Sequence, residues 1–258
     1  MKKPHVIIFS GYGLNTEDET KTAFEVAGAS ADIIHINDII SRPALLKKAQ
    51  IAIVPGGFSY GDDTGGGKAY GNKLMRHLGE ELRAFLERDT LMAGICNGFQ
   101  IITSAGILPG ALIANDSARY SCRWVDLEVQ QENSPWLLDI ARVSLPIAHG
   151  EGKFYASPEL LKELGDSSAV ALRYVRGETS EYFDLPHNPN GSLEDIAGIS
   201  AYGGRVLGLM PHPERATLFT QLPHWTALRE SYVRAGLEMP QEGPGLQIFK
   251  NAVNYFAS

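Results

Sequence analysis

The chain has few cysteines and no long apolar segment. Its 258 residues include only Cys96 and Cys122, too few for the disulfide framework of a small secreted protein. No apolar run approaches the roughly 18 residues that a membrane-spanning helix needs, and residues 6–9, the apolar run behind Met1, are too short for a signal peptide. These absences predict a cytoplasmic globular protein without a membrane segment.

The sequence also lacks an excess of positive charge. It has 23 Lys and Arg against 30 Asp and Glu, a formal net charge of -7, which argues against binding to a phosphate backbone. The seven histidines are scattered without the spacing of paired metal ligands, so no metal site is predicted. Asn115 and Asn190 begin glycosylation sequons, which carry no weight without a secretion signal.

What is present is enough apolar material for one large core. Hydrophobic residues make up 44% of the chain. A chain of this length buries roughly three quarters of its extended surface, so it needs no disulfide or metal for stability. No repeat, low-complexity tract or long linker divides the sequence. We therefore predict a single domain over residues 1–258.

Strands and helices alternate through the first half of the chain. Short apolar runs of the kind seen in buried parallel strands occur at residues 5–9, 31–36, 50–54 and 91–95, and residues 72–88 have helical spacing. Repeated strand–helix–strand units imply a parallel sheet with helices on both faces. The fold class predicted is α/β, with an open, mostly parallel sheet flanked by helices and added antiparallel strands. The second half contributes further strands at 124–129, 143–147, 169–175 and 206–210 and a closing helix at 245–256.

One strand end has the pattern of a nucleophile elbow. Residues 94–100 read GICNGFQ, with small residues two positions before and after Cys96 at a strand-to-helix turn. Such a turn exposes the sulfur above the sheet, and the N-terminus of the following helix offers N–H groups to an oxyanion. A buried structural thiol is the alternative. Cys122 has no such context and is predicted to lie in the core.

A second segment supplies a base. Residues 210–215 read MPHPER, and Pro213 favours an extended conformation at His212. In an extended chain, side chains two residues apart point to one side, so Glu214 can contact His212. A histidine oriented by a carboxylate is what a cysteine nucleophile requires. The alternative is a proline-stiffened turn with a surface histidine.

A third segment, residues 55–62, places two glycines directly after a strand. Gly56 and Gly57 would let backbone N–H groups turn toward a developing negative charge. The alternative is a flexible loop.

Together these segments resemble the class I (triad) glutamine amidotransferases. Within that class the chain is similar, nearly end to end, to the glutaminase components of phosphoribosylformylglycinamidine synthase. The matching motifs are GGFSYGD at 56–62, GICNGFQ at 94–100, PIAHGEG at 146–152, NPNGS at 188–192 and PHPER at 211–215.

The resemblance implies a flavodoxin-like fold and a role for each motif residue. Cys96 would attack the side-chain amide of glutamine, His212 would carry the proton and Glu214 would orient His212. The backbone N–H groups of Gly57 and Asn97 would hold the oxyanion. A further residue, Gln100, would help bind the substrate glutamine.

The resemblance also implies a partner. Ammonia would pass to a synthetase subunit that binds ATP and magnesium, while this chain would hold no cofactor, and a small accessory subunit is a further possible partner. Within residues 146–152, His149 and Glu151 have no triad role, so we predict that they contact the partner; a strand end with a plain turn is the alternative. Residues 62–67 and 242–250 look closer to family members fused to their synthetase, whereas Met1 directly before the first strand favours a freestanding chain.

Two other classes of function compete with this interpretation. Cysteine-dependent peptidases and deglycases of the same fold superfamily typically have histidine directly after the cysteine, where this chain has Asn97. A regulatory module that only binds glutamine would need a broken triad, and all three members are present. A glutaminase serving a different synthetase is a third alternative.

Overall fold

The computed structural model describes residues 3–62, 65–131 and 134–257 and is built around one nine-stranded sheet. The sheet order is β2-β1-β3-β4-β11-β10-β9-β6-β7. The first five of these strands pair in parallel, and the pairs from β11 to β7 are antiparallel. A small separate sheet pairs β5 with β8. The strands are β1 (His5–Ser10), β2 (Ser30–His35), β3 (Ile51–Val54), β4 (Leu91–Ile95), β5 (Ala111–Ile113), β6 (Ser121–Val129), β7 (Arg142–His149), β8 (Lys153–Tyr155), β9 (Val170–Val175), β10 (Ile196–Ala201) and β11 (Val206–Leu209).

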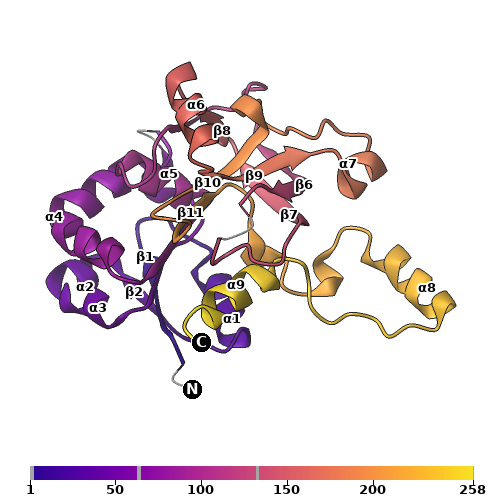
Figure 1. The fold of residues 1–258 in the computed structure, drawn as a ribbon, viewed down its shortest axis with the longest axis horizontal. Helices are drawn as coiled ribbons and strands as arrows, with labels where there is room; N and C mark the ends of the chain where they lie inside the picture. Colours follow the sequence, from indigo (N-terminus) through magenta and orange to yellow (C-terminus); the bar gives the residue numbers. More distant parts are fainter. Residues whose placement is uncertain (1–2, 63–64, 132–133, 258) are drawn as a thin grey trace.

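Helices cover the parallel part of the sheet on both sides. In Figure 1, α2 to α5 lie to one side of the parallel strands, and α1 lies with α9 on the other. This arrangement confirms the α/β class expected from the alternation of strands and helices. The helices are α1 (Glu17–Val26), α2 (Ile36–Ser41), α3 (Ala44–Lys48), α4 (Lys68–Glu87), α5 (Asn97–Ser104), α6 (Pro158–Asp166), α7 (Glu178–Tyr182), α8 (Trp225–Ala235) and α9 (Leu246–Asn254).

The core explains why the first strands were visible as apolar runs. Every residue of β3 and β4 is buried, because helices cover both faces of these strands. Helix α5 follows β4 directly and packs against the sheet at Gly98, where a Cβ atom would lie 1.8 Å from the Val54 carbonyl oxygen. Only glycine fits such an approach, which fixes α5, and the turn before it, against β3.

Two predictions need correction. The core position expected for Cys122 is wrong, because Cys122 is exposed. Cys122 lies at the start of β6, where β6 pairs with β7 on one side. On the other side, pairing with β9 begins only at Asp126, so no described strand covers β6 beside Cys122. The helix expected at 72–88 begins earlier, at Lys68, after Gly67 with φ 74°.

Helix α8 stands away from the body of the molecule (Figure 1) and has no buried residue. Among the described helices, none combines the length and apolar character of a membrane-spanning segment. Part of the fused-type segment 62–67, residues 63 and 64, and also Met1, lie outside the described residues.

Candidate active site

Cys96 lies on a strained turn between β4 and α5. Its φ of 52° and ψ of -107° fall outside the usual regions for a residue with a Cβ atom. Two backbone hydrogen bonds hold the turn: the Cys96 N–H donates to Leu209 O at 2.8 Å, and the Gln100 N–H donates to Cys96 O at 3.2 Å. Cys96 is only 4% exposed. Its Sγ donates to the carbonyl oxygen of Ala148 at 3.6 Å.

His212 and Glu214 form a buried pair. The Nδ1 atom of His212 lies 2.6 Å from Oε1 of Glu214, and their side chains are 3% and 0% exposed. The predicted contact is present, although Pro213–Arg215 forms a 3₁₀ turn rather than the extended chain that we expected. The His212 N–H donates to Pro146 O at 2.8 Å, which ties the base segment to β7.

The protonation of His212 reflects two opposing effects. Burial favours the neutral ring and lowers its pKa, but the carboxylate of Glu214 and the nearby sulfur of Cys96 outweigh burial and raise the pKa to about 10. Since Glu214 occupies Nδ1, Nε2 is the nitrogen left to exchange a proton with the thiol. Among the described residues, Nε2 has no hydrogen-bond partner.

Two backbone N–H groups, those of Gly57 and Asn97, are the candidates for the predicted oxyanion site. Leu14 and Gly57 face each other across an isolated antiparallel bridge. The hydrogen bonds of this bridge belong to the neighbouring residues: the Asn15 N–H donates to Gly56 O, and the Phe58 N–H donates to Gly13 O. The N–H of Gly57 therefore points away from residues 13–15. Gly57 has φ 155°, and a Cβ there would lie 2.4 Å from Gly13 O.

Asn97 supplies the other group. As the first residue of α5, it has a backbone N–H without an intrahelical acceptor. Gly56, before Gly57, is held by its N–H bond of 2.9 Å to the Thr16 hydroxyl and packs beside the His212 ring. That these two N–H groups hold an oxyanion stays a prediction.

The side chains of Asn97 and Gln100 are already engaged. Asn97 Nδ2 donates to Gln100 Oε1 at 2.6 Å, and Gln100 Nε2 donates to the carbonyl oxygen of Glu151, also at 2.6 Å. Asn97 Oδ1 accepts the Ser59 N–H at 2.9 Å. Gln100 is 5% exposed, so a substrate contact through its carboxamide requires an exchange of one of these bonds, and that role stays a prediction.

The segment 146–152 forms a wall of the site. Its carbonyl oxygens at Pro146, Ala148 and Glu151 accept hydrogen bonds from His212, Cys96 and Gln100 respectively. No side-chain pattern in the sequence could have indicated this, since the groups involved belong to the backbone.

His149 and Glu151 face inward more than expected for a docking surface. His149 is 2% exposed, and burial, with the charge of His212, lowers its pKa to about 3. Glu151 Oε2 accepts the Gly66 N–H at 2.8 Å. Their contact with a partner stays a prediction.

Two exposed aromatic rings stand near the site. Phe58, directly after Gly57, has its ring centroid 6.1 Å from that of Tyr120. Partial burial and the nearby sulfur of Cys96 raise the pKa of Tyr120. These exposed rings therefore lie beside a nucleophile that is itself nearly buried.

The described residues contain no cluster of three or more His, Cys, Asp or Glu side chains suited to a metal ion. The chemistry available here is that of a thiol, an imidazole, a carboxylate and two amide donors.

Comparison with known proteins gives one consistent family. Residues 3–256 match the CobB/CobQ-like glutamine amidotransferase domain. The chain is 42% identical to phosphoribosylformylglycinamidine synthase subunit PurQ of Methanococcus maripaludis, over 98% of this chain and 97% of the relative. It is 40% identical to subunit PurQ of Dehalococcoides mccartyi, over 99% and 98%. A solved structure of PurLQS from Thermotoga maritima has a TM-score of 0.74 and 30% identity, covering 99% of this chain and 100% of that chain.

Proposed function

Because the chain belongs to the CobB/CobQ-like glutamine amidotransferase family, and matches PurQ subunits over nearly their whole length, we propose that it is the glutaminase subunit of a phosphoribosylformylglycinamidine synthase. The observation that carries the residue assignment is the buried His212–Glu214 pair beside the strained Cys96 turn. These three side chains form a nucleophile, a base and an orienting carboxylate.

The first half of the reaction forms a thioester. The Cys96 thiol, which donates to Ala148 O in the resting site, first passes its proton to Nε2 of His212. The resulting thiolate attacks the side-chain carbonyl carbon of glutamine, and the carbonyl oxygen becomes an oxyanion. The N–H groups of Gly57 and Asn97 stabilise that charge. As the tetrahedral intermediate collapses, Nε2 of His212 donates a proton to the leaving nitrogen, and ammonia departs.

The second half regenerates the enzyme. His212, now neutral, takes a proton from water, and the resulting hydroxide attacks the thioester carbonyl. The carbon–sulfur bond breaks, the sulfur takes the proton back from Nε2 of His212, and glutamate is released. Throughout, Glu214 holds Nδ1 protonated and stabilises the imidazolium.

The ammonia serves a synthetase partner. The structure of PurLQS from Thermotoga maritima supports assembly with other subunits, and we assign ATP and magnesium to the synthetase rather than to this chain. A small accessory subunit is a further possible member of the complex. We place the reaction in the cytoplasm, as expected from the two-cysteine composition.

The test separates the ammonia source from the synthetase. Cys96→Ala should be mixed with the synthetase and supplied with either glutamine or high ammonium. Product should form with ammonium and not with glutamine, because only glutamine hydrolysis has been removed. If the variant makes product equally well from glutamine, the proposed function is wrong.

A further inference from the structure

Asn115 sits at the centre of a buried polar cluster that none of the catalytic steps uses. The residue is 3% exposed, so its sequon cannot be a glycosylation site in the folded chain. Its Nδ2 donates to the carbonyl oxygens of Arg119 at 2.9 Å and His149 at 3.0 Å. Its Oδ1 accepts the Gly152 N–H at 3.0 Å and lies 3.2 Å from Nδ1 of His149.

These partners fix the orientation of the amide. Both acceptors of Nδ2 are carbonyl oxygens, so Oδ1 must be the atom that faces His149. His149 therefore carries its proton on Nδ1 and donates to Asn115. One carboxamide thus contacts both ends of the turn at 149–152, through the His149 carbonyl and ring and the Gly152 N–H. The backbone adds a further bond, from Asn115 N–H to Gly150 O at 2.9 Å.

The same turn contacts the catalytic centre on its other side. The carbonyl of Ala148, just before the turn, accepts from Cys96 Sγ, and the carbonyl of Glu151 accepts from Gln100. A shift of the turn would move both acceptors at once. A displacement of about 1 Å at a reacting centre can cost about 10²-fold in rate.

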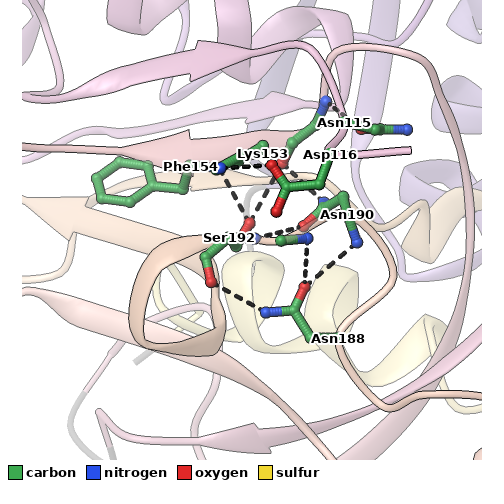
Figure 2. Close-up of polar contacts among 9 residues, drawn as sticks. Asn115, Asp116, Lys153, Phe154, Asn188, Asn190 and Ser192 are labelled. Atoms are coloured by element: carbon green, nitrogen blue, oxygen red, sulfur yellow. Dashed lines mark hydrogen bonds and ion pairs between the residues drawn. The ribbon is translucent and has the colours of Figure 1, made fainter. Parts of the chain in front are cut away.

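A second loop supports the turn. Asn190 Nδ2 donates to Gly152 O at 2.8 Å, and the Asp116 N–H donates to Asn190 O at 3.0 Å. Figure 2 shows Asn190 and Ser192 between Asn115 and Asn188. No catalytic step requires the motifs at 146–152 and 188–192 to lie together. Both motifs nevertheless belong to this one hydrogen-bonded network.

Asn188 offers a matched comparison. Its side chain also makes four hydrogen bonds, donating to Ser192 O and Asp195 Oδ1 and accepting the N–H groups of Asn190 and Gly191. All four bonds stay within the 188–195 loop. These four bonds therefore link Asn188 to the turn at 149–152 through Asn190 rather than directly.

We propose that Asn115 is a positioning residue for the glutaminase site. It clamps the 149–152 turn, and through the carbonyls of Ala148 and Glu151 it holds Cys96 and Gln100 in place. This inference rests on the proposed glutaminase function.

The test compares Asn115→Ala with Asn188→Ala in the full chain, alone and mixed with the synthetase. We measure kcat and KM for glutamine, the thermal midpoint, and the rate of iodoacetamide modification at Cys96, with the exposed Cys122 as internal reference. Asn115→Ala should lower kcat/KM by at least about 10-fold, raise KM and change the Cys96 modification rate. Asn188→Ala should lower the thermal midpoint similarly but change kcat/KM by less than about 3-fold.

Asn115→Asp covers the case in which Asn115→Ala folds poorly. It keeps the size and the acceptor but loses both donors, so it should lose activity in the same direction. Equal kinetic losses at Asn115 and Asn188, or wild-type kinetics in the folded Asn115 variants, would overturn the positioning role. A wild-type chain that hydrolyses no glutamine in either setting would instead overturn the proposed function.

Discussion

Replacement of Glu214 by Gln removes one charge from the buried pair while keeping its shape. The carboxylate lies 2.6 Å from the ring nitrogen, and its side chain is 0% exposed. Two unit charges about 4 Å apart interact by about 4 kcal/mol at an effective dielectric constant of about 20. That loss corresponds to about three pKa units at His212, and, if it applies to the transition state, to about 10³-fold in kcat. Loss of the orienting carboxylate in a serine protease costs up to about 10⁴-fold.

The assay is steady-state glutamine hydrolysis by Glu214→Gln in complex with the synthetase. We expect kcat to fall by about 10³-fold and KM for glutamine to change little, because Glu214 contacts the base and not the substrate. Glu178→Gln is the matched control, since Oε1 of Glu178 lies 2.9 Å from Nε2 of the buried His224. It should leave kcat unchanged. A Glu214→Gln enzyme within 3-fold of wild type would refute the orienting role.

Three further outcomes are expected. A glutamine analogue with an electrophilic side chain should label Cys96 and spare Cys122, as peptide mass spectrometry would show; label at Cys122 would contradict the elbow assignment. Burial lowers the pKa of His149 to about 3, so between about pH 6.5 and 3 the folded chain binds fewer protons than the unfolded chain and loses stability as the pH falls. His149→Gln should therefore reduce the slope of unfolding free energy against pH near pH 5 by up to about 1.4 kcal/mol per pH unit, measured by urea unfolding; an unchanged slope would show that His149 is not buried as a neutral ring. Gly98→Ala should destabilise the fold by about 1–3 kcal/mol or more, because its Cβ would meet the backbone of β3. Gly165→Ala should not, because outside the adjoining backbone of its own helix no described atom lies within 4 Å of the added Cβ.

The parallel half of the fold could be predicted because strands that are buried on both faces consist of continuous apolar runs. The run at 91–95 coincides with β4, and 50–54 differs from β3 by one residue. Strand β10 was missed, since it alternates neither in sequence nor in burial and contains Gly198. Helix α8 was also missed, because a helix without a buried residue has no apolar face to detect.

In the candidate site, too, some groups could be predicted from the sequence and others could not. Cys96, His212 and Glu214 could be predicted as site residues because their chemistry lies in side chains with informative neighbours. The acceptor at Ala148 was not, because an alanine carbonyl has no signature in sequence. Asn115 was visible only as a sequon, and its role as a clamp depends on a turn 34 residues away along the chain.

The position of Cys122 has a consequence for work under oxidising conditions. Cys122 is exposed on β6 and pairs in register with Ala148 on β7, whose carbonyl contacts the catalytic sulfur. Its exposure makes Cys122 accessible to peroxide, whereas Cys96 is nearly buried. A sulfenic acid or a glutathione adduct there would sit on the residue that pairs with Ala148, whose carbonyl contacts the catalytic sulfur. Inactivation by oxidants would then not identify the catalytic thiol as the oxidised group, and a Cys122→Ser background is needed to separate the two.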